Sequence, residues 1–363
     1  MYYRGDLGYS WFVRRIQFLF GASLIAAVLL AGCAQESKPV GPTFTGRLFF
    51  LSGDKTKGAD LAELQTAAAG SANNYQVITS GIFEAVASPD QSKLLYTTKD
   101  GIMLRDFAGG AMKSLIKGDS FCLAWAPDGN HFSYKQKSGE TTKLYASDLE
   151  GKTKLVLDYP NDAAECAQWI SADRIVFDRF VGAAPKKANE QLKPNTTTVA
   201  TIGESVKTKD TPRKWTIEAV CSKSNNGFLR SADQGKLLVA KNIDHFESLD
   251  PSAAPCSECR FVGYAAQSCV PFFIEQPTST TTELFYLNPT NWAKQKPGSI
   301  NRTFSPGAKA LIKSSAKLMI IGDGANLFLV DTESGAIVSL LDKTAEDSST
   351  PTDQKLPLVW IEK

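Results

Sequence analysis

The sequence predicts an all-β fold, a β-propeller of about seven four-stranded blades, with six as the alternative count. A turn motif recurs along the chain, and a strand motif recurs with it, in units of roughly 40 to 45 residues. Each unit holds about four short strands and cannot bury both faces of its sheet alone. Such units have to stack against like units around an axis, so residues 44–363 are expected to form a single domain.

The turn motif is clearest at Trp125-Ala-Pro-Asp-Gly129, which leads into an apolar strand. Pro127 fixes φ near the value that the second turn position needs, Asp128 can accept hydrogen bonds from the turn backbone, and Gly129 tolerates a positive φ. Each copy therefore predicts one hairpin, followed by a strand with one buried face. The further copies are Ala87-Ser-Pro-Asp90, Ser171-Ala-Asp173, Ser231-Ala-Asp233 and Phe304-Ser-Pro-Gly307.

The strand motif is an apolar run that ends in Asp or Asn. Its copies are Ile102-Met-Leu-Arg-Asp106, Leu144-Tyr-Ala-Ser-Asp148, Leu284-Phe-Tyr-Leu-Asn288 and Leu327-Phe-Leu-Val-Asp331. The run at the end of the chain, 356–361, is expected to pair with the first strand at 46–51, because propeller rings commonly close by joining their two chain ends. The Ala-rich stretch 54–74 carries leucines at helical spacing and predicts a short helix or a loop.

The turn motifs resemble the Ser-Pro-Asp-Gly repeat of the TolB-like, WD-related bacterial propellers. The resemblance covers most of the mature chain in patches. It implies a propeller fold and leaves the ligand open, since the same repeat occurs in periplasmic binding proteins and in the propeller domains attached to peptidases. Two copies depart from the pattern: Ser171-Ala-Asp173 lacks both Pro and Gly, and Ser231-Ala-Asp233 lacks Pro.

Residues 1–32 are predicted to be a lipoprotein signal peptide. Arg14 and Arg15 precede the apolar run Phe18–Leu30, which at about 1.5 Å per residue is too short to span a hydrocarbon core of about 30 Å. The run ends in Leu30-Ala-Gly-Cys33, which resembles the bacterial lipobox and implies a lipid on the Cys33 thiol. Residues 33–43 would then be the lipidated cysteine and its tether. The alanine after Cys33 favours the periplasmic face of the outer membrane within the bacterial cell envelope.

The remaining six cysteines form an even set, and an exported compartment permits disulfides. Cys122 and Cys166 each begin a Cys-x-x-Trp in successive units, so they are expected to pair. For the other four, two more disulfides are the leading interpretation. Zinc at Cys256, Cys259 and Cys269 with Cys221, or a redox pair in Cys256-Ser-Glu-Cys259, are lesser alternatives. The disulfide candidates are thus Cys122, Cys166, Cys221, Cys256, Cys259 and Cys269.

A long polar stretch at about 181–213 interrupts the repeat and predicts an insertion. Loops of this length inside a compact fold are usually functional or disordered. Its basic residues outnumber its acids, so an acidic protein surface or an anionic envelope component is the expected complement. The candidate partner-binding residues are Lys186, Lys187, Lys193, Lys207, Lys209 and Arg213.

The composition argues against nucleic acid as a partner, because 40 basic and 38 acidic residues leave a formal net charge of only +2. Two histidines are present, and no Gly-x-Ser-x-Gly, phosphate-binding loop or His-Glu-x-x-His occurs. We therefore predict no catalytic residue, metal or cofactor. The leading function is a non-enzymatic lipoprotein that binds envelope proteins or acts as a scaffold. The alternatives are an extracytoplasmic hydrolase or lyase acting on glycans, and a structural subunit of a larger membrane-associated complex.

Overall fold

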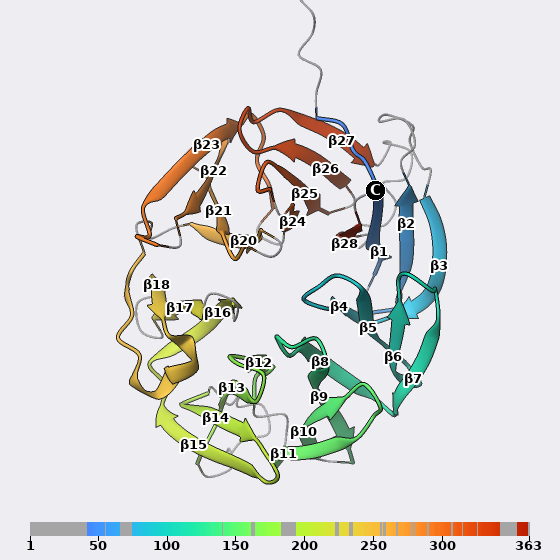
Figure 1. The fold of residues 1–363 in the computed structure, drawn as a ribbon, viewed down its shortest axis with the longest axis vertical. Helices are drawn as coiled ribbons and strands as arrows, with labels where there is room; N and C mark the ends of the chain where they lie inside the picture. The colour runs from blue at the N-terminus through green and yellow to red at the C-terminus, as the bar shows by residue number, and fades with distance from the viewer. Residues whose placement is uncertain are drawn as a thin grey trace, which may run out of the picture. The chain divides into compact units, whose positions relative to one another are not determined.

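The structure is a computed structural model. It describes residues 42–54, 56–65, 75–139, 141–160, 164–182, 194–221, 225–231, 235–254, 256, 259–265, 268–276, 278, 280–288, 290–305, 308–313, 315–324, 326–341 and 354–361. The lipid-attachment candidate Cys33, with the predicted signal peptide, lies outside these residues, and so do Lys186, Lys187 and Lys193. In the described part of the chain, seven four-stranded antiparallel sheets form a ring (Figure 1). The prediction of a seven-bladed propeller is confirmed.

We number the blades along the chain and name the strands of each blade from the axis outward (Figure 1). Blades 1 to 3 consist of β28 (Gln354–Ile361), β1 (Arg47–Gly53), β2 (Ala59–Gln65) and β3 (Tyr75–Ile82); β4 (Glu84–Ala87), β5 (Lys93–Thr98), β6 (Gly101–Asp106) and β7 (Met112–Lys117); and β8 (Ser120–Trp125), β9 (His131–Ser138), β10 (Thr141–Asp148) and β11 (Thr153–Pro160).

Blades 4 to 7 follow the same order. They consist of β12 (Gln168–Trp169), β13 (Arg174–Arg179), β14 (Thr196–Ile202) and β15 (Val206–Pro212); β16 (Trp215–Cys221), β17 (Asn226–Ser231), β18 (Leu237–Lys241) and β19 (Ser252–Ala253), with the 3-10 helix η1 (Ile243–Ser248); β20 (Arg260–Tyr264), β21 (Pro271–Glu275), β22 (Thr282–Leu287) and β23 (Lys294–Ile300); and β24 (Lys309–Ile312), β25 (Leu318–Asp323), β26 (Asn326–Asp331) and β27 (Ile337–Leu341).

The ring closes in blade 1, where the last strand of the chain pairs with the first. β28 lies antiparallel to β1, with Leu356 opposite Leu51 and Trp360 opposite Leu48. The indole Nε1 of Trp360 donates a hydrogen bond to the Thr45 carbonyl oxygen at 2.8 Å. The predicted pairing of the two ends is therefore confirmed, and β28 holds the innermost position of its blade.

Each pair of neighbouring blades encloses an apolar cluster, and the second strand of a blade contributes to two of them. Leu94 and Leu95 are adjacent on β5, yet Leu94 packs with blade 1 and Leu95 packs with blade 3. Phe272 and Phe273 on β21 divide in the same way between blades 7 and 5. Successive side chains of a strand point to opposite faces, so both faces of these strands are buried. The expectation of strands with a single buried face was wrong for the second strands.

Acidic and amide side chains hold the turns of the blades, as the turn motif predicts. The Asp90 carboxylate accepts hydrogen bonds from Ser88 Oγ (2.6 Å) and from the backbone N of Ser92 (3.1 Å) in the turn between β4 and β5. Partial burial raises the pKa of Asp90, but these hydrogen bonds outweigh it and lower the pKa to about 2. The same kind of side-chain acceptor holds the turn between the third and fourth strands of four blades, through Asp106, Asp148, Asn288 and Asp331.

The structure confirms one further turn prediction and corrects two other predictions. The copy at Ser231 lies in the predicted hairpin, which joins β17 to β18, the second and third strands of blade 5. The copy that begins at Phe304 lies in no hairpin, because it falls between β23 of blade 6 and β24, the first strand of blade 7. Residues 59–65 form the strand β2, not a helix. A turn motif identifies a reversal of the chain, because it depends on local φ preferences, but it does not specify which two strands the reversal joins.

The predicted insertion at 181–213 is largely part of blade 4. β14 and β15 both lie in it, and residues 183–193 fall outside the described residues. β14 is rich in threonine, yet Thr197 and Thr198 are buried and hydrogen-bonded. β15 is the outer strand of its blade and is largely exposed, so it shows no apolar alternation. This is why the two strands look like a polar loop in the sequence.

Candidate functional site

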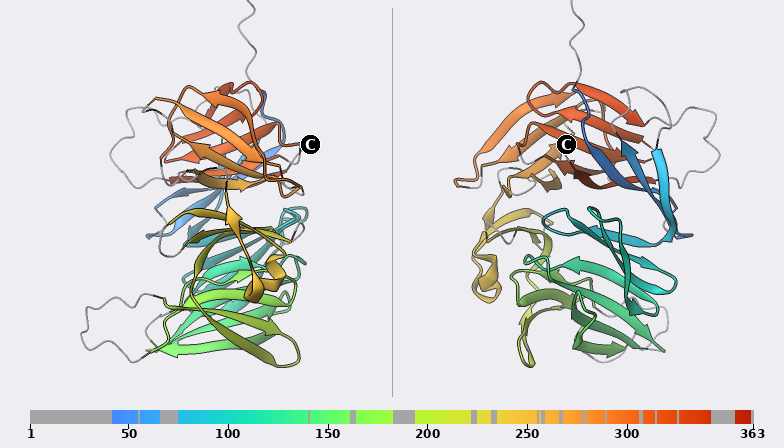
Figure 2. Two further views of the ribbon diagram at one scale, coloured as in Figure 1. Left: turned by 90° about the vertical axis from the view of Figure 1, so that its left-hand side faces the viewer. Right: turned by 45° about the vertical axis from the view of Figure 1, so that its right-hand side comes forward.

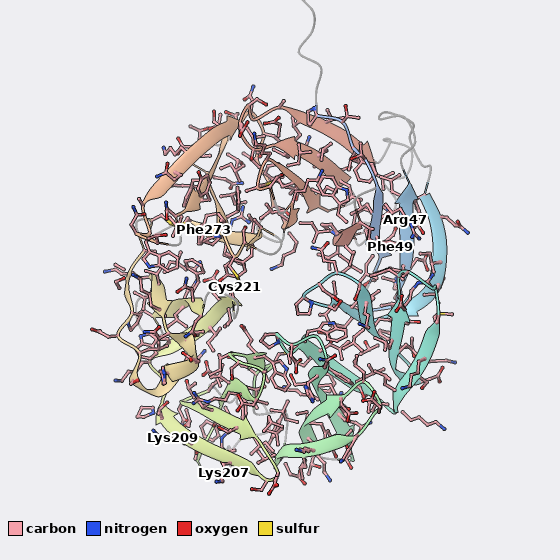
Figure 3. All side chains as sticks on the ribbon, in the orientation of Figure 1. Arg47, Phe49, Lys207, Lys209, Cys221 and Phe273 are labelled. Atoms are coloured by element: carbon pink, nitrogen blue, oxygen red, sulfur yellow. A yellow bond between two sulfur atoms is a disulfide. The ribbon has the colours of Figure 1, made fainter. Side chains whose placement is uncertain are left out.

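The three predicted partner-binding residues that the structure describes lie in two environments around blade 4. Lys207 and Lys209 are exposed on β15, at the outer rim of the ring (Figure 3). Arg213 lies in the linker between β15 and β16, and its side chain is mostly buried, with 19% of its surface exposed. The three are therefore not parts of one loop, and only the two lysines are available on the surface of the strand.

β15 is the outer strand of its sheet, and no strand among the described residues pairs with its outer edge. The backbone N of Ile202 donates to the carbonyl oxygen of Asp173, so Ile202 and every second residue before it in β14 direct their backbone groups toward β13. The alternate residues Thr201 and Val199 direct theirs toward β15, where they lie opposite Lys207 and Lys209. Backbone groups alternate in direction along a strand, so Thr208 and Asp210 direct their N–H and C=O groups outward. An edge of this kind can pair with an added strand.

Arg213 connects blades 4 and 5 through a buried ion pair. Its Nε lies 2.7 Å from Asp178 Oδ2, and its Nη2 donates to Thr216 Oγ1 at 2.7 Å. The second Asp178 oxygen accepts a hydrogen bond from Thr197 Oγ1 at 2.5 Å. Glu165 Oε1 lies 3.4 Å from the same guanidinium. The arrangement fixes the orientation of the interblade linker instead of leaving a cation available for a partner.

The two carboxyl groups beside Arg213 are harder to ionise than usual. Burial raises the pKa of Asp178, although the hydrogen bond from Thr197 and the charge of Arg213 lower it. Burial also raises the pKa of Glu165, against the lowering effect of Arg213. Glycoside cleavage needs two carboxyl groups that flank a substrate bond. Both oxygens of Asp178 are occupied by protein partners, so this cluster leaves Glu165 without a second available carboxylate.

Replacing Arg213 by Met is expected to lower the free energy of unfolding by about 3 to 5 kcal/mol, because it leaves Asp178 buried and unpaired. The loss should be larger at pH 8 than at pH 4. Without the arginine the folded-state pKa of Asp178 rises further, and stability tied to a raised carboxyl pKa is lost as pH increases through it. Urea unfolding at the two pH values measures both effects.

The double variant Arg213→Met, Asp178→Leu serves as the control for this prediction. Removing both partners leaves no buried charge, so the double variant should be more stable than Arg213→Met alone. Equal stability of the parent and Arg213→Met at both pH values would contradict the role of the ion pair.

The six cysteines of the propeller form three disulfides. Cys122 pairs with Cys166, with the Cα atoms 5.2 Å apart, as their equivalent positions in the repeat predict. The other two bonds join Cys221 to Cys269 and Cys256 to Cys259. The four later cysteines therefore supply no thiolates for zinc in this structure. Among the described residues, no three or more His, Cys, Asp or Glu side chains are grouped so that they could hold a metal ion.

The Cys-x-x-Trp motif joins neighbouring blades near the axis. Cys122 has a left-handed backbone, φ 58°, within a β-bulge of β8. Such a bulge redirects a side chain, and here the thiol bonds to the cysteine just before the inner strand of blade 4. Trp169 Nε1 donates to the Ala124 carbonyl at 3.2 Å. Trp125 repeats the contact one blade earlier, donating to the Val86 carbonyl at 2.9 Å.

The structure also has features that the sequence did not predict. The exposed edge of β15 is one. Another is a hollow beside η1, whose wall includes Trp292 of blade 6. Neither feature has a recognisable sequence pattern, because a sheet edge and a hollow both depend on which strands lie next to each other in the fold. No helix in the described part of the chain combines the length and the apolar character that crossing a membrane requires.

Comparison with known proteins supports the fold and assigns no family. No protein-family model and no curated protein matches the sequence. A protein of unknown function from Desulfotomaculum acetoxidans is similar in structure, with TM-score 0.55, 11% identity, and an alignment covering 86% of this chain and 100% of that one. A putative 6-phosphogluconolactonase from Bacteroides fragilis gives TM-score 0.51 at 12% identity, covering 88% and 98% of the two chains.

TolB from Acinetobacter baumannii gives TM-score 0.41 at 11% identity, and the alignment covers 88% of this chain and 66% of TolB. Identities of this size show a shared fold alone. The chain is a seven-bladed β-propeller that shares its fold with the proteins from D. acetoxidans and B. fragilis.

Proposed function

We propose that this chain is a non-enzymatic binding or scaffold module of the bacterial cell envelope. In this proposal Cys33 carries the lipid anchor, and the propeller lies at the periplasmic face of the outer membrane. The three disulfides support an exported location, because disulfides persist in oxidising compartments and are rare in the cytosol. The ring then acts as a rigid support that presents a contact surface to an envelope protein.

The observation that carries the binding proposal is the exposed edge of β15. Thr208 and Asp210 direct backbone donors and acceptors away from the sheet, and an extended segment of a partner can add to such an edge as a further strand. Lys207 and Lys209 flank these positions and are exposed. Lysines on an edge discourage pairing between copies of the same chain.

The expected partner segment is extended and acidic. Asp210 already pairs with Arg179 at 2.7 Å, so its charge is compensated within blade 4. Lys207 and Lys209 then leave the edge positively charged, and acidic side chains beside an added strand complement them. Such contacts weaken with salt, since exposed charges are screened over about 8 to 10 Å at physiological ionic strength.

The test places a photoreactive amino acid at position 208, between the two lysines, in the full-length lipoprotein in its native host. Irradiation should link it to one recurrent envelope protein. Adding Lys207→Glu and Lys209→Glu should reduce the yield about tenfold or more, because two attractive charges become repulsive. Deleting residues 185–209 would be a poor test, because it removes β14 and part of β15.

The matched control reverses two exposed charges elsewhere, Lys99→Glu and Lys236→Glu, with the photoreactive residue still at position 208. This control should retain the cross-link. The proposal fails if position 208 yields no recurrent product, or if both pairs of charge reversals reduce the yield equally.

A further inference from the structure

A hollow of about 480 Å³ lies at the outer part of blade 5, where the blade lacks most of its fourth strand. β19 has two residues and pairs with β18 at Leu238 and Val239. Between β18 and β19 the chain forms η1 and the segment 249–251, on the outer side of the ring (Figure 1, Figure 2). The hollow lies between this segment, the end of β18 and Trp292 of the next blade. Its volume is within the range of small-molecule sites, about 300 to 1,000 Å³.

Trp292 provides the aromatic wall. It lies in the turn between β22 and β23, where its backbone N bonds to the Asn288 carbonyl at 2.7 Å. Its ring packs edge-on with Phe228, with the centroids 5.6 Å apart and an interplanar angle of 86°. This contact anchors the indole to the apolar cluster between blades 5 and 6, and the residue remains partly exposed at the hollow. The φ of 59° is unusual for a bulky residue.

Polar side chains make up most of the rest of the wall, beside the apolar Val239 and Leu249. Lys241 and Asn242 come from the end of β18, and Ser248, Asp250 and Ser252 come from the crossing segment. All five are exposed. Asn242 precedes η1, but its side chain does not cap the helix, so the amide remains available for other contacts. The wall therefore combines hydrogen-bond donors and acceptors with the indole of Trp292 and two aliphatic side chains.

The charges around the hollow nearly balance. Lys241 contributes one positive charge and Asp250 one negative charge, with His245 as a further polar wall residue. A balanced set does not favour an anion such as a phosphate, which needs several converging donors. It does not favour a purely apolar molecule either, because five exposed polar side chains would lose water without gaining partners.

We propose that this hollow binds a neutral saccharide. A sugar ring has an apolar face of C–H groups, which can lie against the Trp292 indole, and an edge of hydroxyl groups, which can bond to Asn242, Asp250 and Ser252. The ligand needs no net charge, in keeping with the opposite charges of Lys241 and Asp250. This site lies in blade 5 and is separate from the exposed edge of β15 in blade 4.

The test is calorimetric titration of the intact protein with three neutral disaccharides, maltose, cellobiose and N,N′-diacetylchitobiose, and with glucuronic acid. At least one neutral disaccharide should bind with a Kd of about 1 mM or tighter. Trp292→Ala should weaken binding about tenfold or more, and Trp292→Phe, which keeps an aromatic surface, should weaken it less.

The variant Asn242→Ala provides a second test if Trp292→Ala does not fold. Asn242 is exposed and its side chain does not cap η1, so this variant should fold. It should weaken disaccharide binding several-fold. Lys152→Ala, at a different hollow between blades 3 and 4, is the matched control and should leave binding unchanged. The proposal is overturned if no neutral disaccharide binds, if only glucuronic acid binds, or if the folded Trp292 and Asn242 variants bind like the parent.

Discussion

Deleting residues 354–363 should abolish the cooperative unfolding transition of the propeller. The deletion removes β28, the innermost strand of blade 1, and exposes the inner edge of β1. It also removes Trp360 from the apolar cluster between blades 7 and 1, and Val359 from the cluster between blades 1 and 2. Losing a buried Trp alone costs about 3 to 5 kcal/mol, and a domain has about 5 to 15 kcal/mol in total.

Thermal denaturation followed by circular dichroism measures this effect. A synthetic peptide of residues 354–363, added in trans, should restore a transition by occupying the vacant edge of β1, and a peptide of scrambled sequence should not. A truncated chain that unfolds with the parent's midpoint would show that the ring does not depend on its closing strand.

Replacing both Cys122 and Cys166 by Ala should lower the free energy of unfolding by about 4 kcal/mol. The bond closes a loop of 44 residues, and a cross-link restricts the unfolded chain more as the loop lengthens. The Cys256–Cys259 bond has a sequence separation of 3, so its removal should cost only about 1.6 kcal/mol by the same relation. Urea denaturation of the two double-alanine variants gives the comparison.

The order of these two values is the critical result. Cys256 and Cys259 are both buried, whereas Cys122 is buried and Cys166 is exposed. Loss of packing alone would therefore cost at least as much for the Cys256–Cys259 variant, and only the difference in loop length predicts the opposite order. If removing the Cys256–Cys259 bond costs as much as removing the other, the stabilisation does not come from restricting the unfolded chain.

Local signals predicted most of the propeller from the sequence. The turns at Asp90 and Asp128 lie where their φ preferences and acceptor side chains indicate. The strand motif marks the third strand in four blades, because in these blades that strand runs into the same type of side-chain-held turn. The pairing of Cys122 with Cys166 followed from their equivalent positions in successive units. These features depend on residues close in sequence or one repeat apart.

The candidate binding surface depends on contacts that the sequence does not display. Lys207 and Lys209 look like loop residues because an exposed outer strand lacks apolar alternation. Arg213 looks like a surface cation, but its partner Asp178 lies on β13, beyond an intervening stretch of 34 positions that carries no pairing signal. The hollow beside Trp292 lies where β19 has only two residues. The local sequence does not predict how short this strand is, because its length depends on its pairing with β18.

The closure of blade 1 also determines the order in which the chain can fold. Lys355 and Ser52 are paired across β28 and β1 although they are 303 residues apart. Blades 2 to 7 each use consecutive strands and can assemble as the chain emerges. The inner edge of β1 stays unpaired until β28, at the end of the chain, has been synthesised and can pair with it. Contacts between distant parts of a chain slow folding and prolong the exposure of unpaired edges. The interval before closure is therefore when this protein is most prone to aggregate.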